Sequence, residues 1–472
     1  MTGEEVNNMT PKISDRTRLP IAERQAEWIK ALHFEDIPDK SIALAKNCVF
    51  DFLGLAIKGS TIARSKPARR LVEHVGASGS GATVIGGRKT AVFYAAYANG
   101  TFGHSLEYDD CQINCGHPGA CVIPAALAMA ETRGATGRDL LTAIVAGYQS
   151  MVWSIAPIHR RTLELGWHGT KVAGPFGAAA AASKLLDLPP EQIAHALSIA
   201  ASESSGPLEY SQSGGEVKRV HAGSASRSGV QAALLAEAGL TGPREIFEGL
   251  RGIYRLFSND SPYDVEQYWT GKLHIDDVMF KLYPSPGSTH AAFDAFTQLQ
   301  REHSFTHDMV EAVFVDTADW SVAHGASIYE PTDVVSAQFS LAFGLALLSV
   351  IGRNRLEDYS APENWRDPTL LDFAHRVQPV SKPVPPGGSE LFTHVHVHLK
   401  DGRRVDRYQP APRGYPSNPA TADDLSRKFL SITDGVLVSQ DQDELRALIG
   451  NLENLTSLDP IIGILGRVRA IE

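Results

Sequence analysis

Apolar residues recur every three or four positions through the first half of the chain, the spacing of one buried helix face. This pattern predicts helices over residues 21–32, 39–58, 91–105, 122–132 and 139–155, separated by Gly and Pro. Two further predicted helices, over residues 174–184 and 190–202, are rich in small side chains, and another covers residues 224–238. Because small residues let helices approach closely, we expect a tightly packed helical core.

The pattern changes after about residue 271. Alternating apolar and polar positions predict strands over residues 310–317, 391–399 and 404–408, with helices over residues 288–302 and 336–350 among them. A Pro-rich stretch over residues 409–419 is expected to be a linker, followed by helices over residues 421–432 and 441–449.

These elements predict a mainly α protein in which a large helical domain is interrupted by a smaller α+β lid. The expected parts are a flexible N-terminal arm (residues 1–18), a helical domain (19–275), the lid (276–411) and a C-terminal return to the helical domain (412–472).

Composition narrows the class of protein. The 472 residues are 43% hydrophobic and 21% charged, as in ordinary soluble globular proteins. The net charge of −10 argues against a general nucleic-acid binder. The most apolar stretch, residues 339–352, is shorter than the roughly 20 residues of a membrane span, so we expect a buried helix and no membrane partner. Four cysteines and a polar N-terminus without a signal peptide predict a cytoplasmic location.

The densest polar cluster covers residues 104–120, HSLEYDDCQINCGHPGA, and three interpretations of it compete. It could be an active-site loop that supplies acid–base groups, or a structural loop whose Asp and His residues cap helices. A metal or iron–sulphur site is the third interpretation, although the cysteine spacing matches no standard pattern. The candidate residues are His104, Glu107, Asp109, Asp110, Cys111, Cys115, His117 and Cys121.

Three other segments concentrate chemically useful side chains. His168 precedes a Gly-rich helix entry that would favour an anion, or it is a histidine packed beside a tryptophan. Lys218, Arg219 and His221 are expected in a Gly-flanked turn before a helix, where they suit a carboxylate or phosphate, or form a solvated basic loop. Lys281 begins a Pro/Gly-rich turn at the expected domain boundary, where small-molecule sites are common.

The alternation of His394, His396 and His398 places these three residues on one face of a predicted strand. The pattern looks like a metal site but has no carboxylate nearby in the sequence, which favours an ordinary strand face. Nucleotide-binding, serine-hydrolase and zinc-peptidase motifs do not occur in the sequence.

Several segments, in this order, resemble the MmgE/PrpD family, which includes 2-methylcitrate dehydratase, cis-aconitate decarboxylase and iminodisuccinate epimerase. They span the chain from about residue 21 onwards. The matching pieces are CVFDFLGLAIKGS (48–60), ANGTFGHSLEYDD (98–110), GHPGACVIPAALAMAE (116–131), GWHGTKVAGPFGAAAAASKLLDL (166–188), ALSIAASESSG (196–206), VKRVHAGSASRSGVQAALLAEAGLTGP (217–243), FKLYPSPGSTHAAFDA (280–295) and DDLSRKFL (423–430).

The resemblance implies a helical domain with an inserted lid, usually in a homodimer, and an active site between the two parts that needs no metal or organic cofactor. Position by position, it assigns catalytic roles to His117, His168, Lys218 and Glu107, where Glu107 replaces the usual Asp. Substrate-binding roles are expected for Cys111 (in place of the usual Thr), Arg219, His221, Lys281 and Tyr283. The decarboxylase branch has a histidine five residues after the lid lysine, and here that position is Pro286.

The function that the resemblance implies is a cofactor-free lyase that acts on a small di- or tricarboxylic acid by acid–base catalysis. A cis-aconitate-decarboxylase-like reaction is the leading expectation. Dehydration of a 2-methylcitrate-like acid and epimerisation of an iminodisuccinate-like acid need the same acid–base pair and carboxylate cradle, so both stay open. A catalytically silent binding protein is the alternative from a different class.

Overall fold

The computed structural model describes residues 19–77, 79–213, 215–322 and 328–469. The expected flexible arm, residues 1–18, lies outside the described residues. The predicted fold class is confirmed, because the chain is mainly helical with one small mixed sheet and one short hairpin. None of the helices in the described ranges is long and apolar enough to cross a membrane.

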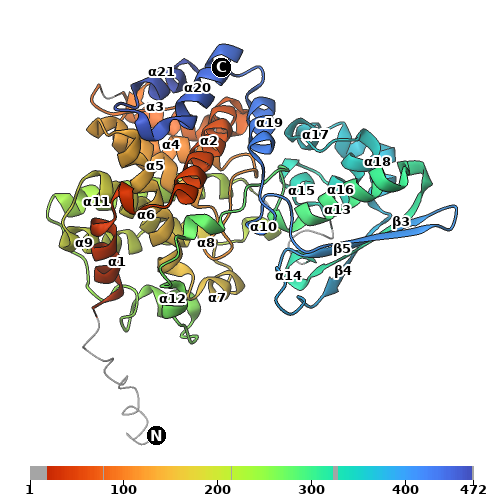
Figure 1. Ribbon diagram of the computed structural model, residues 1–472, viewed down its shortest axis with the longest axis horizontal. Helices are drawn as coiled ribbons and strands as arrows, with labels where there is room; N and C mark the ends of the chain where they lie inside the picture. Colours follow the sequence, from red (N-terminus) through yellow and green to blue (C-terminus); the bar gives the residue numbers. More distant parts are fainter. Residues whose placement is uncertain (1–18, 78, 214, 323–327, 470–472) are drawn as a thin grey trace, which may run out of the picture.

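The first half of the chain forms a helical body around α8 (Gly169–Leu185), which packs against α5, α6, α9 and α11 (Figure 1). The other elements of this half are α1 (Ile21–Ala31), α2 (Asp39–Thr61), α3 (Lys66–Val75), β1 (Ala82–Thr83), β2 (Lys89–Thr90), α4 (Val92–Gly103), α5 (Pro118–Arg133), α6 (Gly137–Ile155), α7 (His159–Glu164), α9 (Pro190–Ala201), α10 (Tyr210–Ser213), α11 (Lys218–Glu237) and α12 (Ile253–Ser258).

Small side chains explain why α8 can sit at the centre. A β-carbon added to Gly174 would lie 2.6 Å from the Cys121 sulphur of α5 and 2.7 Å from Ala225 of α11. The alanines over residues 178–182 are fully buried. Close contacts of this kind depend on glycine and alanine, so the small-residue pattern correctly predicts the packed core.

Three C-terminal helices return to this helical body: α19 (Ala422–Thr433), α20 (Ser439–Gly450) and α21 (Asp459–Arg467). Leu425, Phe429 and Leu445 from these helices belong to the same hydrophobic core as α2 and α5. In Figure 1 the blue C-terminal helices lie beside the red and orange N-terminal ones.

A second hydrophobic core lies under a four-stranded sheet with the order β4-β3-β5-β6. Its strands are β3 (Val310–Ala318), β4 (Val377–Lys382), β5 (Thr393–Leu399) and β6 (Arg404–Gln409), and only the β3–β4 pair is parallel. Helices cover one face of the sheet (Figure 1). The helices of this part are α13 (Gly287–His303), α14 (Asp319–Ser321), α15 (Val334–Phe339), α16 (Leu341–Ala346), α17 (Leu356–Ser360) and α18 (Pro368–Ala374).

The second half of the chain differs from the prediction in one predicted helix and one strand that was not predicted. The single helix expected over residues 336–350 is broken at Ser340, which has an extended ψ of 109° and caps α16 by accepting a hydrogen bond from the Phe343 N–H. A π-helical segment, Leu347–Ile351, then ends at Gly352. Strand β4 was not predicted, because Pro379 interrupts the alternation of apolar and polar residues. Proline is tolerated at this position because β4 is an edge strand.

Candidate active site

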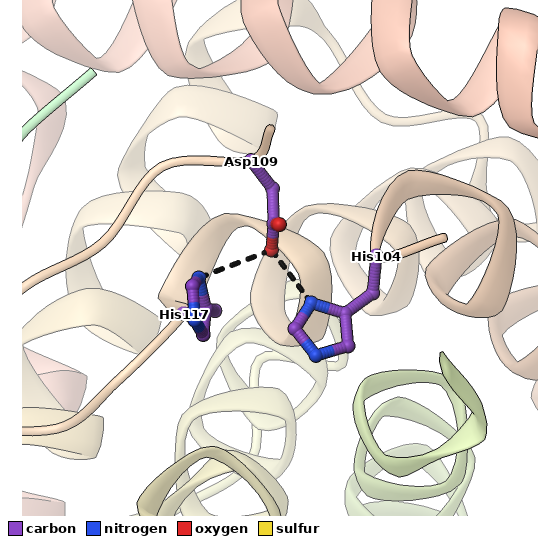
Figure 2. Close-up of side chains that lie close together, drawn as sticks. All are labelled: His104, Asp109 and His117. Atoms are coloured by element: carbon purple, nitrogen blue, oxygen red, sulfur yellow. Dashed lines mark hydrogen bonds and ion pairs between the residues drawn. The ribbon is translucent and has the colours of Figure 1, made fainter. Parts of the chain in front are cut away.

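The loop between α4 and α5 places two histidines on one aspartate. His104 is the C-cap of α4 and His117 is the N-cap of α5. The Nδ1 atom of His104 lies 2.7 Å from the Oδ2 atom of Asp109, and Nδ1 of His117 lies 3.3 Å from the same oxygen (Figure 2). Nδ1 of His117 also lies 2.8 Å from the Asp110 carbonyl oxygen. The loop therefore forms a buried histidine–aspartate–histidine cluster.

Burial and charge act against each other within this cluster. Burial alone would raise the pKa of Asp109, but the two histidines and their hydrogen bonds hold it well below its usual range. Burial lowers the pKa of His104 more than the nearby carboxylate raises it. His104 is therefore neutral at neutral pH, and Asp109 is ionised.

The Nε2 atom of His104 is buried and has no hydrogen-bond partner among the described residues. Its other ring nitrogen, Nδ1, is held by Asp109. An imidazole that is oriented by a carboxylate on one side and unpaired on the other can exchange a proton with a bound ligand.

Asp110 fixes the loop to the helical body. Its carboxylate accepts hydrogen bonds from the Tyr148 hydroxyl at 2.7 Å and from the Gly119 N–H at 3.0 Å. Burial raises the pKa of Asp110 to about 7 in spite of these bonds. The side chain holds the start of α5, and therefore His117, in place.

A buried carboxylate lies between two lysines. Glu107 has a left-handed backbone (φ 55°), and its side chain accepts hydrogen bonds from Lys218 of α11 and Lys281. The Lys281 Nζ atom lies 2.8 Å from Glu107 Oε1. Burial alone would raise the pKa of Glu107, but the two ammonium groups hold it well below its usual range. The two lysines therefore form the cationic part of the site around an internal anion.

The structure corrects the turn that was expected at residues 213–224. Lys218, Arg219 and His221 lie on the first turns of α11, which begins at Lys218. The helix continues through Gly223. This position is a glycine because α4 passes so close that no side chain fits: a β-carbon added to it would lie 2.2 Å from the Tyr97 carbonyl oxygen. Gly223 therefore indicates a helix crossing and not a turn. On the first turn of α11, the Arg219 side chain donates a hydrogen bond to the Ser105 carbonyl oxygen.

Two predicted site histidines from different segments, His168 and His221, form a pair that is assembled from two helices. His168 is the N-cap of α8, and its Nδ1 atom lies 2.9 Å from Nδ1 of His221. The Tyr210 ring contacts both imidazoles, with centroid separations of 5.7 Å. Burial, and then the charge of Lys218, hold the pKa of His168 well below its usual value, so this imidazole is neutral.

A small pocket of about 20 Å³ opens at this site, which is room for about one water molecule. Three residues of α15 (Val335, Gln338 and Phe339) form one wall. Buried Gln338 joins the two parts of the chain, because its side-chain amide donates to the carbonyls of Leu106 and Pro284. The remaining lining residues are His104, Ser105, Glu107, Tyr210, Gly215, Glu216, Lys218 and Arg219.

The predicted site residues divide into three groups. Glu107, Lys218 and Arg219 line the pocket, and Lys281 lies behind Glu107. His117 and His168 do not line it, although both rings are next to His104, at centroid separations of 4.9 and 6.0 Å, and His221 lies behind His168.

Cys111 and Tyr283 also lie outside the pocket lining. Cys111 exchanges backbone hydrogen bonds with Met279, and burial raises the pKa of its thiol to about 12. The Tyr283 hydroxyl donates to Asp294 at 2.9 Å in the second core. The structure thus gives both residues structural contacts, and their expected binding of substrate stays a prediction.

The family resemblance assigned no role to His104 and Asp109, although both are among the candidate residues of the polar loop. Sequence reasoning missed three other residues that the structure brings to the site, namely Tyr210, Gln338 and Phe339. The signal for His104 and Asp109 was present in the sequence, as a histidine five positions before an aspartate in the polar loop. Gln338 had a weaker signal, since it is a lone amide at the edge of a strongly apolar stretch.

His104, Asp109 and His117 are also close enough to hold a metal ion, because one donor atom from each lies within 4.8 Å of the others. The cysteines give no such group. All four are free, and within the described ranges none belongs to a set of three possible ligands. The reactive groups of this loop are therefore imidazoles and carboxylates, and three of them are also placed to hold a cation.

Comparison with known proteins places the chain in a family. A family model described as the MmgE/PrpD N-terminal domain matches residues 23–266, and one described as the MmgE/PrpD C-terminal domain matches residues 283–454. A cis-aconitate decarboxylase of Aspergillus terreus is 27% identical over 93% of this chain and 94% of its own length. The human and mouse proteins of that name are 26% and 25% identical over 92% of this chain. The chain therefore belongs to the MmgE/PrpD family.

Proposed function

We propose that this protein is a lyase that removes CO2 from a small unsaturated di- or tricarboxylic acid of the cis-aconitate type. The observation that carries the proposal is the buried arrangement of two lysines around Glu107, beside the unpaired Nε2 of His104. Relatives named cis-aconitate decarboxylase, which match almost the whole chain, support the choice of reaction.

The charges of the site suit an anionic substrate. Glu107 carries one negative charge and Lys218 and Lys281 carry two positive charges, so the group keeps one buried positive charge. Lys218 has three N–H donors and lines the pocket. In the proposed complex, Lys218 and Arg219 bind a substrate carboxylate, while Lys281 holds Glu107 in place.

The reaction then needs one proton. As the bond to the leaving carboxylate breaks, its electron pair remains with the unsaturated carbon skeleton, and a proton must be added to carbon. We assign this transfer to His104 and His117, because both are oriented by Asp109 and His104 lines the pocket. Asp109 holds the resting proton of His104 on Nδ1, so we propose that Nε2 takes up a proton from water when the anionic substrate binds. The imidazolium then gives this proton to carbon and returns to its neutral form. His168 is the weaker candidate, since it is already bonded to His221.

The pocket must enlarge before it can accept such an acid, because its volume of about 20 Å³ holds only about one water molecule. Helix α15, which forms one wall of the pocket, packs into the second core through Ala337. We propose that α15 moves away when substrate enters, breaking the hydrogen bonds of Gln338 to Leu106 and Pro284.

The test is incubation of the protein with cis-aconitate, 2-methylcitrate, citrate and iminodisuccinate, followed by NMR of the products. The expected result is CO2 release from the unsaturated acid, with a new alkene signal. Water loss from 2-methylcitrate, or inversion of iminodisuccinate, would replace the proposal by dehydration or epimerisation. Turnover of none of these acids would favour a binding protein.

Variants locate the chemistry within the site. We expect His104→Gln and His117→Gln to lower kcat at least a hundredfold, and Lys218→Met mainly to raise KM. The matched control is His303→Gln, which changes an exposed histidine at the end of α13. Unchanged kcat in both His104→Gln and His117→Gln would contradict the assignment.

Two expectations from the family resemblance also become proposals here. The reaction is proposed to need no metal, which elemental analysis of the active protein and assay after chelation would test at the His104–Asp109–His117 cluster. A homodimer is proposed as the assembly, and light scattering coupled to gel filtration would measure its mass.

A further inference from the structure

The four-stranded sheet β4-β3-β5-β6 has one face that points away from the second core, and this face carries histidines and carboxylates from three strands. His394 and His396 are two residues apart on β5 and therefore point to the same face. The strand register places Asp316 of β3 opposite His394, and Asp406 of β6 opposite His396. Strand pairing supplies both carboxylates, Asp406 from the next strand of the same hairpin and Asp316 from a strand that lies far earlier in the chain.

The spacing of these groups suits a single metal ion. One donor atom each from Asp316, His394 and His396 lies within 4.8 Å of the others. The His396 Nε2 atom is 3.7 Å from Asp316 Oδ2, and the two imidazole rings are 4.1 Å apart. Ligand atoms about 2.0–2.2 Å from one ion are separated by roughly 3–4 Å, so small side-chain rotations complete the geometry.

We propose that this face binds one divalent transition-metal ion of the Zn²⁺ class through His394, His396 and Asp316. Two imidazoles and one carboxylate match the preferences of such ions, and water would fill the remaining positions. This site is independent of the proposed lyase reaction, because none of its residues lines the active-site pocket.

Asp406 plays the part of an outer partner. Its Oδ2 atom lies 2.7 Å from Nε2 of His394, and coordination through Nδ1 would leave this hydrogen bond in place. A carboxylate bonded to the far nitrogen of a ligating histidine fixes its ring and raises its basicity. Removing the Asp406 carboxylate should therefore weaken metal binding without removing a ligand.

The site is both reachable and rigid. The three ligand side chains are between 22% and 34% exposed, so an ion can reach them from solvent. Val395 and Val397, which alternate with the histidines, are fully buried in the second core and hold the strand in place. A competing cation is already present, because Lys382 Nζ lies 3.9 Å from Asp316 Oδ2.

The experiment uses the full chain without a polyhistidine tag, stripped with a chelator and titrated with Zn²⁺ by calorimetry and with Co²⁺ by visible absorption. We expect one ion per chain at this site, with affinity at least tenfold lower in His394→Ala and His396→Ala. Asp406→Asn should weaken binding several-fold, and Lys382→Gln should tighten it. His398→Ala, on the same strand face but outside the ligand set, is the matched control.

The alternative location is the cluster of His104, Asp109 and His117. Binding that survives in His394→Ala and His396→Ala but is lost in His117→Gln would place the metal there and overturn the proposal. Absence of binding at 100-fold excess of Zn²⁺ over protein would also overturn it. Circular dichroism of each variant confirms that the sheet is intact, so that lost binding reports a lost ligand.

Discussion

Glu107 is the residue on which the charge balance of the pocket depends. It is 8% exposed, has a left-handed backbone and accepts hydrogen bonds from two buried lysines. A buried carboxylate of this kind is strongly stabilised by its partners, and its loss leaves two ammonium groups uncompensated. The site therefore relies on this side chain for stability as well as for its proposed chemistry.

We predict that Glu107→Gln lowers the free energy of unfolding by about 3–5 kcal/mol, because the neutral amide keeps the shape but removes the charge between Lys218 and Lys281. Urea unfolding at pH 7 measures this change. Glu357→Gln is the control, since Glu357 is 57% exposed and lies 3.9 Å from Lys58, and such pairs contribute less than about 1 kcal/mol. Equal effects of both substitutions would show that Glu107 is not a buried charge partner.

At the scale of elements, the active site depends on where three helices begin or end. His104 is the C-cap of α4, His117 is the N-cap of α5, and α11 starts at Lys218. The sequence predicted the bodies of α5 and α11 but started them four and six residues late, because glycine near a helix start reads as a loop. Gly119 and Gly223 are instead positions of close approach, to Asp110 and to α4.

The contact between α11 and α4 gives the prediction at this scale. An added β-carbon on Gly223 would lie 2.2 Å from both the Tyr97 carbonyl and the Thr101 hydroxyl. Gly223→Ala must push α11 outward, so we expect a loss of at least about 2–3 kcal/mol of stability and a weakened Lys218–Glu107 contact. Urea unfolding and the KM for the substrate measure the two effects.

A matched glycine makes this prediction sharper. Gly466 lies in α21 with no other atom within 4 Å of an added β-carbon. Gly466→Ala should be neutral or stabilise by up to about 1 kcal/mol, because alanine favours the helix. If Gly223→Ala were as harmless as Gly466→Ala, the close crossing of α4 and α11 would be wrong.

The four-stranded sheet shows why some sites cannot be recognised from the sequence alone. Alternation predicted β5 and put its histidines on one face, which the structure confirms. The carboxylates facing them come from β3 and β6, and Asp316 is 78 residues before His394 in the chain. Cross-strand register is set by pairing in three dimensions, so local pattern could not supply it.

At the scale of the whole molecule, the fold buries many histidines in a neutral state. Burial lowers the pKa of His159 and His221 to about 4 and that of His290 to about 3, and it also lowers those of His104 and His168. In the unfolded chain these side chains titrate near 6.5. Asp110 acts in the opposite direction, because its raised pKa favours the folded state as the pH falls from about 7 towards 4.

We predict that the free energy of unfolding falls as the pH is lowered from 7 to 4.5, because five buried histidines outweigh the four buried or half-buried carboxyl groups whose pKa burial raises, Asp51, Asp110, Glu248 and Asp294. Below about pH 6.5 the unfolded chain binds protons at these histidines that the folded chain does not bind, so acid favours unfolding. His159 alone, with a pKa of about 4 in the fold, should account for roughly 2–3 kcal/mol of the change. Urea unfolding at both pH values measures the change in the free energy of unfolding.

His159→Gln should reduce the difference by that amount, whereas His303→Gln, at an exposed position, should not. A protein equally stable at both pH values would mean that these histidines are not buried as neutral groups.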